Sequence, residues 1–167
     1  SRRPGAVAVL FLDIDDFKFV NDSHGHPVGD ELLRAVPARL AEVLRRGDTL
    51  ARFGGDEFAL LCTDLSGPDE AATVAQRVLH GFRRPFMAGS EEIAVTASVG
   101  IAVASDPGPT ADEMLSDADA AMYRAKAQGR ARFELFDSEL RARVHERLEL
   151  AHDLRQAIDQ DQLSVFY

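Results

Sequence analysis

Arg52-Phe-Gly-Gly-Asp-Glu-Phe58 is the stretch of this sequence that decides its fold. Strand-forming residues flank the two glycines, over residues 49–53 on one side and 57–62 on the other. Glycine occupies the positive-φ positions of a tight turn without steric cost, so the pattern predicts a β-hairpin with the glycines at its tip. The tip also carries Asp56 and Glu57. Two acids at a glycine turn are, in isolation, typical of a solvated loop, so their meaning depends on what lies beside them.

A second acidic cluster follows the first strongly apolar run of the chain. Residues 6–12 read Ala-Val-Ala-Val-Leu-Phe-Leu, which predicts a central strand buried on both faces. Asp13, Asp15 and Asp16 follow at once and repel one another unless something cationic neutralises them. Asp16 can open a short helix, where an acid favours the N-terminal dipole, but Asp13 still belongs to the strand. A divalent cation held by Asp13 and by the acidic hairpin tip would satisfy both clusters.

The remaining pattern alternates helices and strands. The elements expected after the strand at 6–12 are a short helix at 17–22, a helix with apolar residues from 32 to 44, the hairpin, a helix around 74–82, a strand at 92–104, a helix capped by Thr110 and Glu113 and ended at Gly129, and a strand at 132–136. This βααββαβ order predicts an α+β fold, ferredoxin-like or palm-like, in which helices surround a mainly antiparallel central sheet. The end of the first strand and the hairpin tip are expected to meet at one edge of that sheet.

Composition and charge narrow the function classes. The chain has 167 residues, of which 46% are hydrophobic and 28% charged, as in an ordinary globular domain. Its formal net charge of -9 argues against binding to nucleic acid or to a membrane surface. We expect no membrane segment and no signal peptide. The single cysteine, Cys62, lies in an apolar strand pattern and is predicted to be a buried thiol, which favours a reducing, cytoplasmic compartment.

The character of the sequence changes at Asp137, so residues 1–136 are predicted to form one domain. Residues 137–160 are predicted to form a linker helix, because they carry an amphipathic stripe. The apolar members of this stripe are Leu140, Val144, Leu148, Ala151, Leu154 and Ile158. Residues 161–167 begin another strand-like run, which we interpret as the start of a further, truncated domain.

Seven short blocks stand in order between about Ala6 and Phe133. They are Phe11-Leu-Asp-Ile-Asp-Asp-Phe-Lys18, Asn21-Asp22, Gly25-His26, Gly29-Asp30, Gly54-Gly-Asp-Glu-Phe58, Ser98-Val-Gly100 and Ala118-Asp-Ala-Ala-Met-Tyr123. Together they resemble a GGDEF-type diguanylate cyclase domain. The resemblance implies an enzyme that condenses two GTP molecules into cyclic di-GMP and two pyrophosphates, as a homodimer because each domain holds half of the reaction.

The resemblance also concerns what surrounds the domain. The helix and the Asp-x-Leu-Thr-type segment that precede the first strand in the family are missing from this chain, and they often support dimerisation. At the other end, Leu163-Ser-Val-Phe-Tyr167 resembles the opening strand of an EAL-type cyclic di-GMP phosphodiesterase domain. The parent is therefore expected to be a tandem GGDEF–EAL protein.

The resemblance assigns roles to the two acidic clusters. Asp13 and Asp56, with the carbonyl group of Ile14, match the family's metal positions, and these hard oxygen ligands suit Mg²⁺ or Mn²⁺. Glu57 matches the residue that assists attack by the 3′-hydroxyl group, either as a base or through the metal. The candidate catalytic residues are therefore Asp56, Glu57 and Lys18.

The resemblance further implies a GTP-binding set, which comprises Phe17, Lys18, Asn21, Asp30, Lys126 and Arg130. Asn21 and Asp30 match the guanine readers, since a carboxylate can accept from the N1–H and 2-amino groups that adenine does not offer together. Lys18, Lys126 and Arg130 match phosphate contacts. The residues alone leave simpler readings open, because an acid in the first turn of a helix and cations in its last turn both favour the helix dipole.

Arg45 and Asp48 form an Arg-x-x-Asp that is separated from Gly54 by five residues and resembles the family's product-inhibition site. An ordinary charged helix end explains these residues equally well. Ala131 departs from the family, which usually has asparagine there, and this leaves the hydrogen bonding of its loop open. The alternative to a cyclase is a catalytically silent module that binds GTP or cyclic di-GMP and regulates an adjacent EAL phosphodiesterase domain.

Overall fold

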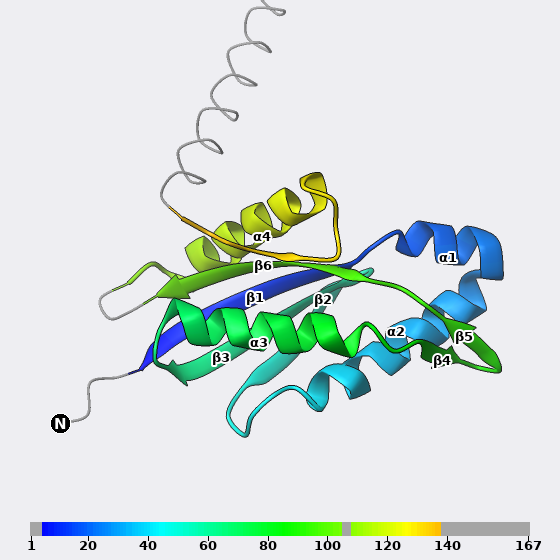
Figure 1. The fold of residues 1–167 in the computed structure, drawn as a ribbon, viewed down its shortest axis with the longest axis horizontal. Coiled ribbons are helices and arrows are strands. Elements are labelled where there is room, and N and C mark those ends of the chain that lie inside the picture. Colours follow the sequence, from blue (N-terminus) through cyan, green and yellow to red (C-terminus); the bar gives the residue numbers. More distant parts are fainter. Residues whose placement is uncertain (1–4, 105–107, 138–167) are drawn as a thin grey trace, which may run out of the picture. The chain divides into compact units, whose positions relative to one another are not determined.

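The computed structural model of this chain describes residues 5–104 and 108–137 (Figure 1). Its strands are β1 (Ala6–Ile14), β2 (Thr49–Gly54), β3 (Glu57–Leu65), β4 (Phe86–Ala88), β5 (Glu91–Ile93), β6 (Ala97–Ala104) and β7 (Phe133–Leu135). Its helices are α1 (Phe17–His24), α2 (His26–Ala41), α3 (Pro68–Gly81) and α4 (Ala111–Ala127). Apart from the small β4–β5 hairpin, this is the βααββαβ order that the sequence predicts. The first strand, the first helix and β3 each extend a few residues beyond their predicted ends.

Five of the strands form one sheet, in the order β2-β3-β1-β6-β7. Neighbouring strands are antiparallel except for β6 and β7, which run parallel. The central strand is β1, and every residue of it except Val7 is buried, as the apolar run predicts. The predicted α+β fold with a mainly antiparallel central sheet is therefore confirmed.

Helices cover both faces of this sheet, with α2 and α3 on one side and α4 on the other (Figure 1). Successive residues of a strand point to opposite faces, so Leu12 joins the core under α2 and α3 while Phe11 packs on the side of α4. The close approach of α4 requires a glycine beneath it. A Cβ atom added at Gly100 of β6 would lie 1.9 Å from the carbonyl oxygen of Ala118, which only a shift of backbone could relieve.

The single strand predicted over residues 92–104 is wrong, because the structure has two strands there. The first, β5, pairs with β4 in a separate two-stranded sheet, and β6 begins only at Ala97. Arg39 of α2 anchors this region, since its guanidinium group lies 4.3 Å from the centroid of the Phe86 ring and donates to three backbone carbonyl groups within residues 81–85. These partners lie more than forty positions from Arg39, so local apolar alternation does not reveal them.

Both ends of α4 follow the signals in the sequence. The Thr110 hydroxyl accepts from the backbone N–H of Glu113 over 3.3 Å, and the Glu113 carboxylate accepts from the N–H of Thr110 over 2.7 Å, which completes a capping box. At the other end Gly129 adopts φ 114°, and its N–H and the next one donate back to carbonyl groups of the last turn. This Schellman arrangement ends the helix and leaves Lys126 and Arg130 at the same end.

Cys62 of β3 is fully buried, as predicted for an apolar strand position. Desolvation, aided by the negative charge of Asp48, raises the pKa of its thiol to about 11. The thiolate is the reactive form, so this cysteine is inert near neutral pH.

Two predictions fall at the edge of what the structure describes. Beyond Asp137, the predicted linker helix of residues 137–160 and the strand-like run of residues 161–167 lie outside the described residues. Within residues 5–104 and 108–137, no helix is both long and apolar enough to cross a membrane.

Candidate active site

The hairpin tip lies against the end of β1, so the two acidic clusters meet at one edge of the sheet. In the β1–β3 ladder Asp13 is the partner of Glu57, and the N–H of Ile14 donates to the carbonyl oxygen of Asp56 over 3.2 Å. Arg52 fastens the turn, because its guanidinium group donates twice to a carbonyl oxygen at the tip, over 2.9 and 2.7 Å. The backbone thus holds three carboxylates of two distant segments beside one another.

Asp13 is the buried member of this group, with only 6% of its surface exposed. Its Oδ1 atom lies 2.8 Å from the Nζ atom of Lys126, at the end of α4. The pKa of the Asp13 carboxyl group is raised to about 6, chiefly by burial; the hydrogen bond and charge of Lys126 lower it, and the nearby charges of Asp56 and Glu57 raise it. Three carboxylates therefore lie beside one lysine at this edge of the sheet.

The donor set fits a divalent cation that completes its coordination with substrate. Within the described part of the chain, no group of three or more His, Cys, Asp and Glu side chains is arranged to hold a metal ion by itself. Mg²⁺ does not need such a cage, since it commonly takes one or two carboxylates together with substrate phosphates and water. Asp13, Asp56 and the Ile14 carbonyl group supply that number and kind of ligand.

The predicted guanine readers lie where α1 and α2 meet. Asn21 of α1 has a buried Oδ1 atom without a hydrogen-bond partner. Gly29 of α2 faces it closely, because an added Cβ atom would lie 1.9 Å from this Oδ1 atom and 3.2 Å from Cζ of Phe17. Asp30 and Lys18 are both exposed beside this junction. A buried amide that lacks its partner is rare and marks a place where a ligand can supply one.

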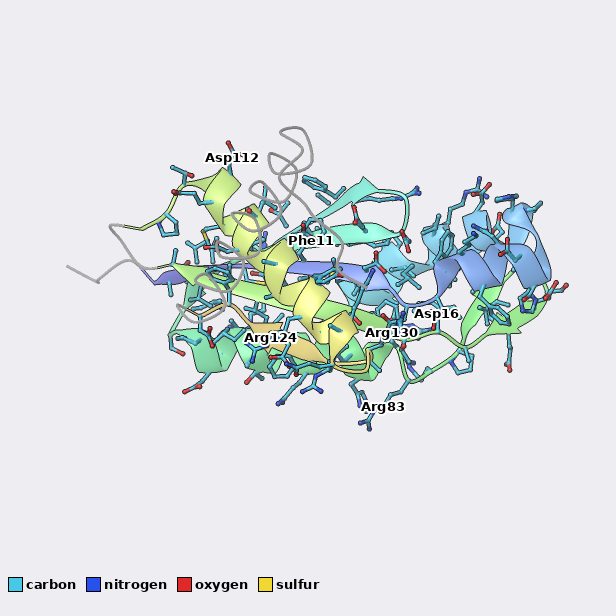
Figure 2. The ribbon with its side chains drawn as sticks, turned by 90° about the horizontal axis from the view of Figure 1, so that it is seen from above. Phe11, Asp16, Arg83, Asp112, Arg124 and Arg130 are labelled. Atoms are coloured by element: carbon cyan, nitrogen blue, oxygen red, sulfur yellow. The ribbon has the colours of Figure 1, made fainter. Side chains whose placement is uncertain are left out.

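The three residues predicted to contact phosphate have different surroundings in the structure. Lys126 is engaged by Asp13, whereas the Nε atom of Arg130 lies 3.7 Å from Oδ1 of Asp16 (Figure 2). Lys18 is exposed on α1. The candidate metal residues therefore meet Lys126 and Arg130, two of the three phosphate candidates, at the end of β1.

Asp15 is a structural residue that the sequence does not reveal. It is only 4% exposed, and its carboxylate accepts from the hydroxyl groups of Thr96 and Ser98 over 2.6 and 2.7 Å. It also accepts from the backbone N–H of Ala131 over 3.1 Å. The carboxylate is thus satisfied by three donors rather than by a cation, and it ties β1 to β6 and to the α4–β7 loop. The missing asparagine at position 131 does not leave that loop loose, because the backbone makes the contact.

Replacing Ala131 with asparagine is expected to stabilise the protein by about 0.5–1 kcal/mol. Ala131 has φ 50°, a left-handed conformation that costs an L-residue about 1–2 kcal/mol and that asparagine tolerates better. The midpoint of urea unfolding measures the effect. Ala131→Val is the matched control and is expected to shift the midpoint downward, since a β-branched residue is more strained there. A lower midpoint for Ala131→Asn would contradict the argument.

The predicted product-site residues lie together but are engaged within the protein. The Asp48 carboxylate accepts from the backbone N–H of Arg45 over 2.9 Å. The Arg45 guanidinium group pairs with Glu70 at the start of α3. Hydrogen bonds from the backbone and hydroxyl groups of Ser66, together with Arg45, lower the pKa of Glu70 to about 2. Glu70 is therefore ionised at any physiological pH and holds the arginine that the site would need.

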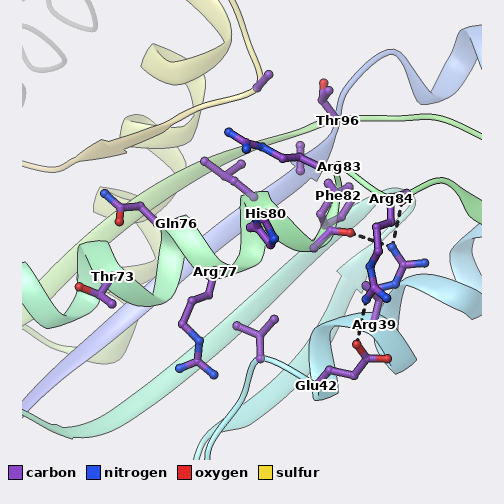
Figure 3. A pocket seen from close by; sticks show the side chains of 15 residues that line it. Arg39, Glu42, Thr73, Gln76, Arg77, His80, Phe82, Arg83, Arg84 and Thr96 are labelled. Atoms are coloured by element: carbon purple, nitrogen blue, oxygen red, sulfur yellow. Dashed lines mark hydrogen bonds and ion pairs between the residues drawn. The ribbon is translucent and has the colours of Figure 1, made fainter.

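A groove of about 960 Å³ lies elsewhere on the described surface (Figure 3). It runs along α3 from the end of α2 to the α3–β4 segment, and Arg39, Arg77, His80, Arg83 and Arg84 are among its lining residues. None of the predicted catalytic or metal residues lines it. The presence of this groove therefore does not indicate where the candidate catalytic residues lie.

Comparison with known proteins identifies relatives of this chain. The family model described as "Diguanylate cyclase, GGDEF domain" matches residues 1–132. MucR of Pseudomonas aeruginosa, named a bifunctional diguanylate cyclase/cyclic di-GMP phosphodiesterase, is 45% identical over 160 residues, which are 96% of this chain and 23% of MucR. NbdA of the same organism, named a cyclic di-GMP phosphodiesterase, is 39% identical over 165 residues, which are 99% of this chain and 21% of NbdA. The chain thus spans less than a quarter of the length of these curated relatives.

A solved structure agrees with the fold. The GGDEF domain of TpbB, also called YfiN, from Pseudomonas aeruginosa superimposes with a TM-score of 0.80 at 34% identity. The match covers 84% of this chain and 83% of that one.

Proposed function

Because the chain belongs to the GGDEF family of diguanylate cyclase domains, we propose that it condenses two GTP molecules into cyclic di-GMP and two pyrophosphates. The observation that carries this proposal is the meeting of Asp13 with Asp56 and Glu57 where β1 ends. In each half-reaction the 3′-oxygen of one GTP attacks the α-phosphorus of the other, the bond from that phosphorus to the β-phosphate bridging oxygen breaks, and pyrophosphate leaves. One domain holds one GTP, so the active species is a homodimer with facing sites.

The residues around the end of β1 then have separate tasks. Asp13, Asp56 and the Ile14 carbonyl group hold Mg²⁺ or Mn²⁺, which screens the phosphates and stabilises the leaving group when it is bound. Glu57 accepts the proton of the 3′-hydroxyl group, directly or through water. The cations of Lys18, Lys126 and Arg130 contact the phosphates, and two of them first have to leave their carboxylate partners Asp13 and Asp16.

Guanine binds at the junction of α1 and α2 in this proposal. The buried Oδ1 atom of Asn21 takes a hydrogen bond from a ring-edge donor, which gives the orphaned acceptor its partner. Asp30 accepts from the N1–H and 2-amino groups, and Phe17 lies beside the base. Adenine lacks the N1–H and 2-amino pair and would leave Asp30 without these donors, so the site discriminates against ATP.

Gly29→Ala is expected to raise the KM for GTP about tenfold, because its Cβ atom would lie 1.9 Å from Oδ1 of Asn21 and must push the amide aside. Steady-state kinetics across GTP concentrations measures this. Gly81→Ala on α3 is the control, since its Cβ atom would meet only the Arg39 side chain at 3.6 Å. Equal KM values for the two variants would remove Gly29 and Asn21 from the base subsite. Circular dichroism checks that both variants are folded.

Product chromatography tests the function itself. The protein is incubated with GTP and Mg²⁺ at several protein concentrations, and cyclic di-GMP is quantified. We expect product to rise more steeply than linearly with protein, since a dimer is required. Asp56→Asn is expected to stop synthesis while GTP binding remains. Binding of GTP with no product at any concentration, also in a longer chain that includes the preceding segment, would refute the cyclase proposal.

That refuting result would favour the second candidate, a silent module that binds GTP or cyclic di-GMP and regulates an adjacent EAL phosphodiesterase domain. The naming of NbdA as a phosphodiesterase supports it, since NbdA matches 99% of this chain. The proximity of Arg45 and Asp48 offers a place for cyclic di-GMP. Either function acts on nucleotides of the cytoplasm, which is where we place the protein.

Glu70→Gln is expected to tighten cyclic di-GMP binding about fivefold, because it frees the Arg45 guanidinium group that Glu70 now holds. Isothermal titration with cyclic di-GMP measures the affinity. Asp69→Asn removes the same charge from the neighbouring position of α3 and serves as the control. If both variants bind as the wild type does, Arg45 is not part of a product site.

A further inference from the structure

We propose that Lys126 is an exchangeable internal cation, which holds Asp13 until a divalent cation binds and then moves to the nucleotide phosphates. This inference rests on the proposed function, because it takes the metal as a ligand of Asp13 and GTP as the molecule that receives the lysine. The Lys126 side chain then has two successive partners, first Asp13 and later the nucleotide phosphates. The order of these partners links metal binding to substrate binding.

The contact itself is close and sheltered. Lys126 Nζ lies 2.8 Å from Oδ1 of Asp13, whose side chain is 9% exposed, while the lysine side chain is 30% exposed. At that distance the ammonium group forms a direct ion pair with one of the two oxygens of the carboxylate. A divalent cation bound by the same carboxylate would lie within a few ångströms of the ammonium group, and like charges so close repel strongly. One of the two has to leave.

Of the two cations, Lys126 is the one that can move away from Asp13. Its backbone is fixed by the Schellman end of α4, but its side chain reaches Asp13 through a flexible four-carbon stem. Among the described residues, its ammonium group makes no ion pair other than the one with Asp13. Arg130, one turn further on, pairs with the exposed Asp16 at 3.7 Å and so lies at the same end of the site. A released Lys126 therefore joins a second cation where phosphates are proposed to bind.

The exchange has two thermodynamic consequences. Without nucleotide, Lys126 competes with the metal for Asp13, so the metal binds more weakly than the carboxylates alone would allow. With nucleotide, the displaced ammonium group gains a phosphate partner, so metal and nucleotide bind cooperatively. Linkage requires the effect to be reciprocal, and both sides can be measured without turnover.

The first measurement is Mn²⁺ binding to the nucleotide-free protein at pH 8, followed through the electron paramagnetic resonance signal of free Mn²⁺. Lys126→Met is expected to bind Mn²⁺ at least about tenfold more tightly than the wild type, while Lys126→Arg is not. Arg124→Met is the matched control, because it removes a cation from the same helix whose partner is Glu134, at 3.8 Å. Its Mn²⁺ affinity is expected to change less than about twofold. Lys126→Gln replaces the methionine variant should that one not fold.

The second measurement uses 3′-deoxy-GTP, which binds but lacks the attacking hydroxyl group. The ratio of its dissociation constants without and with Mn²⁺ reports the coupling, and Lys126→Met is expected to lower this ratio at least about fivefold. Unchanged Mn²⁺ affinity in Lys126→Met, or an unchanged ratio, overturns the exchange. Both shifts without any cyclic di-GMP synthesis, also in the longer chain described above, would overturn the proposed function and leave the exchange standing.

Discussion

Replacing Asp13 with asparagine is expected to abolish cyclase activity and, at the same time, to stabilise the folded protein at pH 8. The loss of activity should reach at least about a thousandfold, since a catalytic cation supplies several kcal/mol of transition-state stabilisation and Asp13 is the buried ligand proposed for it. The gain in stability follows from the pKa. The Asp13 carboxyl group has a pKa of about 6 against 3.8 in the unfolded chain, so its ionised form is disfavoured by folding.

The size and the pH range of this gain follow from linkage. The pKa difference corresponds to at most about 3 kcal/mol, and loss of the Lys126 contact reduces the expected gain to about 1–2 kcal/mol. Between pH 6 and pH 4 the folded protein takes up the Asp13 proton before the unfolded chain does. Wild-type stability therefore rises relative to the variant as the pH falls through this range. The advantage of Asp13→Asn is complete above pH 6 and is lost near pH 4.

Urea unfolding of both proteins at pH 8 and pH 4 tests the stability, and product chromatography tests the activity. Asp119→Asn removes the same charge from an exposed position on α4 and should alter neither stability nor activity appreciably. An Asp13→Asn protein that is less stable than the wild type at pH 8 would contradict the view that this edge of the sheet carries excess negative charge. A variant that keeps its cyclase activity would remove Asp13 from the metal site.

Much of the fold could be predicted because its signals are local. The glycine turn at residues 54–55, the capping box of Thr110 and Glu113 and the helix stop at Gly129 each involve residues within about four positions of one another. The apolar run of β1 likewise predicts, from the strand's own residues, that the strand is buried. These elements, once placed in order, leave few ways to form a sheet, and so the edge where the acidic clusters meet could be anticipated as well.

What the sequence could not show are pairings between distant side chains. Asp13 and Lys126 were each predicted as site residues, one for the metal and one for phosphate, but nothing in their spacing indicates that they contact each other. The first part of the strand predicted over residues 92–104 instead pairs with β4, where Phe86 is the partner of Ile93 and packs against Arg39 of α2. Asp15 looks like one more member of an acidic cluster, although its donors lie 81, 83 and 116 positions away.

Asp15→Ala is expected to destabilise the protein by about 3 kcal/mol, the second large effect we predict. The substitution leaves the fully buried Ser98 hydroxyl and the Ala131 N–H without their acceptor, and an unsatisfied buried donor costs about 1–3 kcal/mol. Asp15→Asn keeps one carbonyl oxygen and should cost less, about 1–2 kcal/mol. Because the Asp15–Ala131 bond holds the loop that follows Arg130, both variants should also raise the KM for GTP.

A double-mutant cycle separates the lost hydrogen bonds from a general loss of packing. Ser98→Ala removes the buried donor, so in the Asp15→Ala/Ser98→Ala protein no hydroxyl is left unsatisfied at that position. We expect the double variant to be at least about 1 kcal/mol more stable than the sum of the single effects predicts. Strict additivity in urea unfolding would mean that Asp15 acts through packing alone. Coupling confined to stability, with an unchanged KM, would show that the carboxylate supports the sheet but does not position the end of α4 where phosphates are proposed to bind.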